Sequence, residues 1–435
     1  MVRGDGVHLW DADGHRYIDV SSGPVATNLG HGNDRVARAM QEQFARIAFA
    51  YPRVARTIPN IELANRVAAL AGPGFERVYF VSGGSEGIET AIKFLRVYAW
   101  TKGEDARRNV ISVMPSYHGG TIATLGIGGD DEAGRPFVGM TAFSSKVPAP
   151  FTYRIPDGDD AGSYARHCAD ALEQQILRLG PETVLAFVLE PVGGVSTGAL
   201  VPHDDYMRAV REICTRYGVY LVFDEVMSGA GRTGKFLAAH HWPDAPPDIV
   251  VLAKGIGAGF TPLGAMLAPG AMVDELAEIG GFNISHTYMA NPLTCAIGLA
   301  VLDEVEERDL IGNAARLGGY LRRRLEELKE ESAIVGDVRG LGLLMALEVV
   351  RDKRMKATLP EQVVAANRLR MLGMEHGLML YARRTNRGRF GDWVMVSPPL
   401  TVTRDEVDEI VGRLGDTLRD FEKELRREGL LPGRG

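Results

Sequence analysis

The chain has 435 residues, which is long for one hydrophobic core, so we expect two domains, one of them a large α/β unit. It carries 49 Lys and Arg against 56 Asp and Glu, a net charge of -7 without a long block of like charge, which argues against nucleic acid and membrane partners. Three scattered cysteines are too few for a disulfide framework or a zinc site, and the start of the chain lacks the apolar core of a signal peptide. We therefore expect a cytoplasmic protein without metal that binds small soluble molecules.

The first predicted elements are a hairpin, a helix and a strand. Residues 8–20 alternate around Asp13-Gly14, a pattern typical of a β-hairpin in a small peripheral sheet. An amphipathic helix from Asn60 stops at Gly72, and a strand is expected over 78–81.

A glycine-rich turn, Ser82-Gly-Gly-Ser-Glu-Gly, links this strand to a helix with apolar residues at helical spacing. Unpaired N–H groups and the helix dipole favour an anion at such a helix start, so Gly84 and Ser85 are candidate phosphate ligands. An ordinary glycine-rich turn between a strand and a helix has the same pattern, and the glycines alone leave both interpretations open.

Four further short apolar runs are predicted to be buried strands of a parallel sheet, at 110–114, 183–189, 219–223 and 248–253. They lead, in chain order, to Tyr117, Glu190, Asp224 and Lys254. Ligands bind at the carboxyl ends of the strands in open α/β sheets, so these residues are expected to face one site. Taken singly, each has a plainer interpretation: packing for Tyr117, a solvated loop for Glu190 and Lys254, an ion pair for Asp224.

The alternation of strands and helices predicts a mostly parallel, doubly wound α/β sheet. The character of the sequence changes after about residue 305, where helical segments precede a sheet-like block at 338–348. A last long helix opens with Thr403 and Glu406 as a capping box. These segments predict a smaller α+β domain.

Pyridoxal phosphate is the cofactor that fits these pieces together. A buried lysine in a glycine-rich turn is suited to form a Schiff base with its aldehyde, which gives Lys254 its role. The phosphate fits the helix start at Gly84 and Ser85, the pyridine nitrogen needs a carboxylate such as Asp224, and Tyr117 can stack on the ring. We therefore predict Lys254 and Asp224 as the catalytic residues.

Ordered motifs along nearly the whole chain point to one family. They are Leu9-Trp-Asp-Ala-Asp-Gly, Ser82-Gly-Gly-Ser-Glu-Gly, Tyr117-His-Gly, Glu190-Pro, Phe223-Asp-Glu-Val-Met-Ser-Gly-Ala-Gly-Arg-Thr-Gly, Ala253-Lys-Gly, Pro262-Leu-Gly-Ala, His286-Thr-Tyr and Pro398-Pro-Leu. With them the chain resembles the class III, fold-type I aminotransferases that depend on pyridoxal phosphate, and among these the ω-amine:pyruvate transaminases.

The resemblance implies a site and an assembly. Gly84 and Ser85 would hold the phosphate, Tyr117 would stack on the ring, Val226 would pack behind it, and Glu190 would be a further cofactor contact. Thr287 would reach the phosphate of the partner subunit, which implies a homodimer with shared active sites, or a tetramer of such dimers. The domains would be 1–45 with 306–435 as the small domain and 46–305 as the large, cofactor-binding domain.

The implied reaction moves an amino group from an amine or ω-amino acid to a 2-oxo acid such as pyruvate, by a ping-pong mechanism through a Schiff base on Lys254. The alternative is a 4-aminobutyrate/2-oxoglutarate-type aminotransferase. Arg389 and Trp393 are the predicted substrate-binding residues. The shape of the substrate pocket is expected to decide which amine the enzyme accepts. The aromatic residues that are candidates for lining this pocket are Trp10, Tyr51, Tyr153 and Trp393.

The chain departs from the family pattern in three places. Met227 stands where many relatives have a glutamine, and a segment before the first hairpin is expected to be short or missing. Arg389 precedes the glycine of Gly391-Asp392 by two residues, where the relatives' mobile carboxylate-binding arginine precedes it by three. Neighbouring alternatives for that role are Arg383, Arg384 and Arg387.

Two other classes compete. Residues 83–87 match the G-x-S-x-G elbow of α/β-hydrolases, with Ser85, Asp224 and His286 in hydrolase order, but this interpretation leaves Lys254 unexplained. A non-catalytic binding protein on the same scaffold would not need both Lys254 and Asp224. An aminotransferase is the better prediction.

Overall fold

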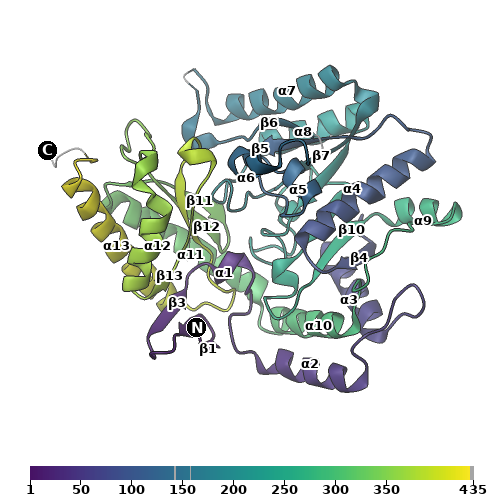
Figure 1. The fold of residues 1–435 in the computed structure, drawn as a ribbon, viewed down its shortest axis with the longest axis horizontal. Coiled ribbons are helices and arrows are strands. Elements are labelled where there is room, and N and C mark those ends of the chain that lie inside the picture. Colours follow the sequence, from purple (N-terminus) through teal and green to yellow (C-terminus); the bar gives the residue numbers. More distant parts are fainter. Residues whose placement is uncertain (142–143, 157, 432–435) are drawn as a thin grey trace.

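The computed structural model describes residues 1–141, 144–156 and 158–431 (Figure 1). Its largest sheet has seven strands in the order β4-β10-β9-β8-β7-β5-β6. Neighbouring strands are parallel except at β10, which is antiparallel to both β4 and β9. The predicted mostly parallel α/β sheet is confirmed. Its strands are β4 (Arg77–Val81), β5 (Asn109–Met114), β6 (Ser144–Pro148), β7 (Val184–Leu189), β8 (Tyr220–Asp224), β9 (Ile249–Leu252) and β10 (Gly264–Ala268).

Helices cover both faces of this sheet. Alternate residues of one strand face opposite layers, so that Phe223 of β8 packs in one core cluster and Val222 in another. Burial on both faces explains why the strands appear in the sequence as continuous apolar runs. One layer contains α4 (Gly84–Thr101) and α9 (Gly270–Glu278), and the other contains α3 (Ile58–Ala71), α7 (Ala161–Leu179) and α8 (Asp204–Tyr217).

A second unit lies beside the large sheet and contains the C-terminal part of the chain (Figure 1). Its antiparallel sheet has the order β11-β12-β15-β14. The helix α13 begins after Thr403, whose side chain and that of Glu406 form the predicted capping box. The elements of this unit are β11 (Val335–Leu341), β12 (Leu344–Val349), β14 (Tyr381–Arg384), β15 (Asp392–Val396), α11 (Leu310–Glu331), α12 (Ala365–Glu375) and α13 (Arg404–Arg427).

The N-terminal segment joins the C-terminal unit through a small sheet. The predicted hairpin is present, with His8 opposite Ile18 across β2 (His8–Trp10) and β3 (Arg16–Asp19). Strand β3 pairs in parallel with β13 (Leu378–Met379), and β1 (Arg3–Asp5) completes the sheet at the other edge. The helix α10 (Pro292–Glu307) runs through the proposed boundary at residue 305, and the domain limits stay a prediction.

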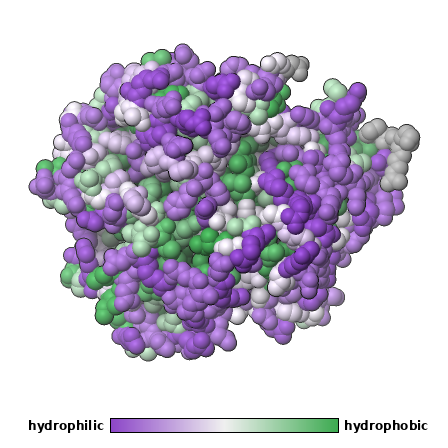
Figure 2. Space-filling view, turned by 180° about the vertical axis from the view of Figure 1, so that it is seen from behind, coloured by the Kyte–Doolittle hydropathy of each residue, from purple (hydrophilic) through white to green (hydrophobic). Residues whose placement is uncertain are grey.

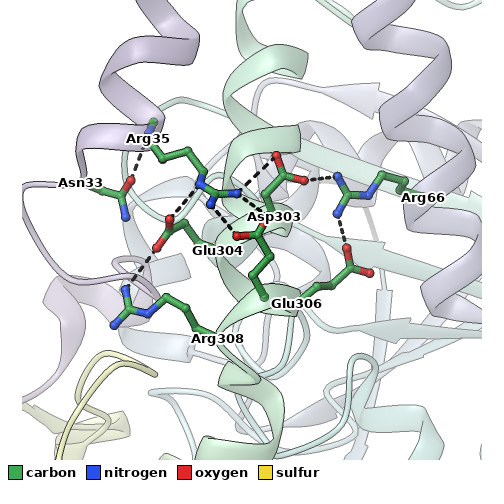
Figure 3. A network of polar contacts seen from close by, with 9 residues as sticks. Asn33, Arg35, Arg66, Asp303, Glu304, Glu306 and Arg308 are labelled. Carbon is green, nitrogen blue, oxygen red and sulfur yellow. Dashed lines mark hydrogen bonds and ion pairs between the residues drawn. The ribbon is translucent and has the colours of Figure 1, made fainter.

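A network of charged side chains fixes the helix α2 (Asp34–Arg46) on α10 (Figure 3). Arg35 of α2 lies 3.0 Å from Glu304, and Arg66 of α3 lies 2.5 Å from Asp303. Arg308 contacts Glu304 from the end of α10 at 3.1 Å. Val36 and Gln43 are the buried residues of α2, and its apolar side chains Met40 and Phe44 are exposed.

Three short helices complete the described α-helices: α1 (Ser22–Val25), α5 (Ile122–Ile127) and α6 (Asp131–Gly134). None of the helices within the described part of the chain is long and apolar enough to cross a membrane.

Candidate active site

The site lies at the carboxyl ends of β8 and β9. Asp224 is the last residue of β8 and pairs in register with Val251 of β9, so Lys254 follows three residues after that partner. Lys254 opens the 3₁₀ turn η5 (Lys254–Ile256) with a φ of +46°, a left-handed conformation that is uncommon for a residue with a side chain. The strand ends therefore bring the predicted acid and amine to one edge of the sheet.

A cavity of about 270 Å³ opens at this edge. Its lining brings together most of the predicted site residues: Gly84, Ser85, Tyr117, Glu190, Asp224, Val226 and Lys254. Thr287, Arg389 and Trp393 do not line it within the described chain.

The glycine-rich turn forms a cradle at the start of α4. A Cβ added at Gly84 would lie 2.9 Å from both methyl groups of Val226, and one at Gly119 would lie 2.5 Å from Ser85 Oγ. The hydroxyl of Ser85 accepts a hydrogen bond from the Gly120 N–H at 3.1 Å. Larger residues would fill this space, so the turn fits a compact anion such as phosphate at the amino end of the helix.

Asp224 is held rigidly. Only 5% of its surface is exposed, its Oδ2 lies 2.8 Å from Nδ1 of His118, and its Oδ1 accepts the N–H of Val226 at 3.1 Å. His118 was not predicted as a site residue, although it directly follows Tyr117 at a strand end and that position could have singled it out. A buried, oriented carboxylate of this kind can keep a ring nitrogen protonated.

Lys254 carries an amine with altered basicity. Burial lowers its pKa to about 8, against the opposing influence of Asp224 and Glu190. Its side chain makes no hydrogen bond or ion pair with any residue that the structure describes. A fraction of this amine is neutral near physiological pH, which is the nucleophilic form.

Glu190 is fixed by the backbone. Its Oε2 accepts the N–H of Tyr117 at 3.2 Å, and its Oε1 accepts the N–H of Gly194 at 2.9 Å. Burial raises the pKa of this carboxyl to about 7, while nearby His118 favours the ionised form and Asp224 disfavours it. Tyr117, a residue that is 43% exposed, lines the same cavity, and its ring has no aromatic partner among the described residues.

The four candidate arginines differ in what they contact. Arg383 pairs with Asp130, and Arg384 pairs with Asp392 at 2.7 Å at the base of the loop between β14 and β15. Arg387 lies 3.9 Å from both Glu132 and Glu361. The exposed Arg389 lies over the ring of Phe390, and its guanidinium makes no ion pair or hydrogen bond within the described chain.

The remaining predicted residues lie away from the cavity lining. Trp393 of β15 is fully buried, and its Nε1 donates to the Val195 carbonyl at 2.6 Å, so it supports a cavity-lining residue from behind. Its substrate contact stays a prediction. Thr287 is exposed on a loop of the large unit.

The aromatic pocket candidates also lie outside the lining. Tyr51 hydroxyl is 2.8 Å from Ser285 Oγ, the hydroxyl of Tyr153 is buried without a partner in the described residues, and Trp10 packs under Arg3. The apolar side chains of the lining are instead Ala26, Val195, Val226, Met227, Ala253, Pro262 and Leu263. Of these, the sequence analysis names Met227 as a departure from the family pattern and Val226 as a cofactor contact.

The hydrolase alternative finds no support in this geometry. The imidazole on Asp224 is that of His118, whereas His286 lies 3.9 Å from Glu86. Ser85 Oγ is hydrogen-bonded to a backbone N–H and to no histidine in the described chain. These contacts do not form a Ser-His-Asp triad.

Comparisons with known proteins agree on one family. The family model described as aminotransferase class-III matches residues 1–418. The chain is 33% identical to diaminobutyrate–2-oxoglutarate transaminase of Halomonas elongata, over 99% of this chain and 92% of that one. It is 30% identical to putrescine–pyruvate aminotransferase of Pseudomonas aeruginosa, over 94% of this chain and 88% of that one.

A solved structure agrees with these relatives. A thermostable (S)-enantioselective omega-transaminase from Thermomicrobium roseum superposes with a TM-score of 0.89 at 36% identity, covering 96% of this chain and 92% of that one.

Proposed function

The chain belongs to the class III aminotransferases, enzymes that depend on pyridoxal phosphate, and we propose that it moves an amino group from an amine or ω-amino acid to a 2-oxo acid such as pyruvate. One observation carries this proposal. A single cavity joins the unpaired amine of Lys254, the buried carboxylate of Asp224 and the anion cradle at Gly84 and Ser85.

When bound, pyridoxal phosphate supplies an aldehyde that receives the amino group and a ring that withdraws electrons from the substrate carbon. Lys254 would hold the cofactor through Nζ and would carry the proton between the substrate Cα and the cofactor C4′. Asp224 would keep the ring nitrogen protonated, and its contact with His118 would fix the carboxylate for that purpose. Donor and acceptor would use the same cavity in turn, which gives ping-pong kinetics.

Gly84 and Ser85 would bind the phosphate with backbone N–H groups and the hydroxyl. Tyr117 would stack on one face of the ring, and Val226, which closes the space beside Gly84, would pack on the other.

Arg389 would bind the carboxylate of the acceptor and swing into solvent when the donor has no carboxylate. Its free guanidinium supports this choice over Arg383 and Arg384, whose guanidinium groups are already paired.

We also propose a homodimer with shared sites. Exposed apolar side chains gather on and after α2 and on the loop that carries Thr287: Met40, Phe44, Ile47, Phe49, Val54, Ile58, Ile61 and Tyr288. Phe49 and Tyr288 contact each other, with ring centroids 5.9 Å apart, so these segments form one surface. Large exposed apolar surfaces mark contacts with partners. Figure 2 shows that hydrophobic residues also gather in a hollow near the middle of the face seen from behind.

The test is a panel of donors and acceptors followed by the absorbance of the bound cofactor. Amines and ω-amino acids should bleach the visible band of the loaded enzyme, and pyruvate should restore it. Restoration by 2-oxoglutarate instead would favour the 4-aminobutyrate/2-oxoglutarate type. A band that no amine bleaches would contradict the proposal.

A further inference from the structure

Within the described chain, the cavity has one carboxyl group without an ionic partner. Its lining includes two carboxyl groups, Glu190 and Asp224, together with one histidine, His118, and one lysine, Lys254. Neither acid lies within 4 Å of a lysine or arginine nitrogen in the described chain, because Asp224 pairs with His118 and Glu190 with backbone N–H groups.

Glu190 is aimed and fixed. The N–H groups of Tyr117 and Gly194 each hold one of its oxygens, so the carboxylate cannot turn away from the cavity that it lines. A Cβ at Gly194 would lie 2.6 Å from Glu190 Oε1 and 2.9 Å from Met227 Sδ, which places the thioether beside the carboxyl. A thioether donates no hydrogen bond, and so Met227 cannot compensate the charge.

When the cofactor binds, as the proposed function requires, it would contact the other two charged side chains, those of Lys254 and Asp224. Lys254 would be joined to the aldehyde, and Asp224 would face the ring nitrogen. Glu190 is then the carboxyl in the described lining that the cofactor does not neutralise. A carboxylate far from bulk water is costly unless it is protonated or paired with a cation.

We infer that Glu190 is a specificity-determining residue that pairs with a second, positively charged amino group of the donor, so that the enzyme prefers diamines to monoamines of the same length. This inference rests on the proposed function and narrows its donor class. An ammonium beside Glu190 completes a charge-assisted hydrogen bond, whereas the methyl end of a monoamine leaves the carboxyl unpaired. Hydrogen bonds to charged groups of this kind change binding by about 10- to 100-fold.

The experiment compares kcat/KM for 1,3-diaminopropane through 1,6-diaminohexane with the matched 1-aminoalkanes, at constant pyruvate. The ratio of diamine to monoamine is measured in the wild type, in Glu190→Gln and in the control Glu330→Gln, an exposed acid of α11 away from the site. One diamine of the series should be long enough to reach from the cofactor to Glu190. For that diamine, the ratio in the wild type and in the control should exceed the ratio in Glu190→Gln by about 10- to 100-fold.

An equal loss with both donors in Glu190→Gln would overturn the inference and leave Glu190 as a cofactor contact. An unchanged ratio with retained turnover would also overturn it. Wild-type turnover of any donor in the series tests the proposed function separately, because no turnover with either the diamines or the monoamines would contradict aminotransfer from amines.

A second measurement follows the same ratio as the pH changes. The titratable groups around Glu190 are Tyr117, His118, Asp224 and Lys254, and Glu190→Gln keeps all four, so the ratio in that variant shows their contribution. Since Glu190 gains its charge as the pH rises while the second amine stays protonated, the wild-type ratio should increase between about pH 6 and 8. A ratio independent of pH would contradict the pairing.

Discussion

Among single residues, Lys254 has its chemistry changed by burial. A protonated amine has no free electron pair, so only the neutral form can bond to an aldehyde, and burial lowers the pKa of Lys254 to about 8. The rate at which apoenzyme takes up pyridoxal phosphate should therefore rise with pH around a midpoint near 8 and level off above it. Stopped-flow absorbance measures this rate. An uptake rate that continues to rise up to pH 10.5, the ordinary pKa of a lysine, would contradict the effect of burial.

Arg389 is the residue on which acceptor recognition depends in this account. Removing one partner of a desolvated charge pair costs roughly 2–5 kcal/mol, about 30- to several-thousand-fold in rate. Arg389→Ala should reduce the pyruvate half-reaction by this factor and leave the half-reaction of a carboxylate-free amine within roughly a few-fold of wild type. Single-turnover kinetics separate the two.

Arg387→Ala, two residues earlier on the same exposed loop, is the matched comparison for Arg389→Ala. Equal losses in both half-reactions of Arg389→Ala would indicate a folding defect. A selective loss in Arg387→Ala instead would transfer the role to Arg387.

Among the elements of the site, the turn from β4 to α4 has little room beside Gly84. The Cβ of Gly84→Ala would press on Val226, and overpacking of this kind costs about 1–3 kcal/mol. We expect weaker binding of pyridoxal phosphate, by about 5- to 150-fold in Kd, measured by titration of the apoenzyme. The second change Val226→Ala should recover part of the loss.

Gly83→Ala is the comparison variant for this turn, because Gly83 has an extended backbone with a φ of -178° and open space where a Cβ would lie. Its loss should be smaller than that of Gly84→Ala. Equal losses would mean that the space beside Val226 does not decide phosphate binding.

At the scale of the whole molecule, the proposed sharing of sites predicts complementation. If Thr287 reaches the phosphate of the other subunit, a Lys254→Ala subunit paired with a Thr287→Ala subunit has one site with both residues intact. Co-refolded mixtures should therefore be more active than the sum of the separate variants. Activity that is only the weighted sum of the two would show that each site is built within one subunit.

The sequence predicts the site residues whose positions depend on residues next to them in the chain. Glu190, Asp224 and Lys254 each follow a buried strand, so local pattern and sheet topology were enough to bring them together. It did not predict the position of Trp393, because packing between β15 and the Val195 loop, distant in sequence, decides that burial. The sequence also did not predict His118 as a site residue, because its partner Asp224 comes from another strand of the sheet.

Lys254 should carry the pyridoxal phosphate, and reductive trapping can show this attachment. Lys146 offers an internal comparison, because burial lowers its pKa to about 7, but its Nζ donates to Ser112 Oγ and to the Gly126 carbonyl, both at 2.9 Å. Borohydride reduction of the loaded enzyme, followed by digestion and mass spectrometry, should place the phosphopyridoxyl group on the peptide containing Lys254. A group on Lys146, or no modified lysine, would contradict the account.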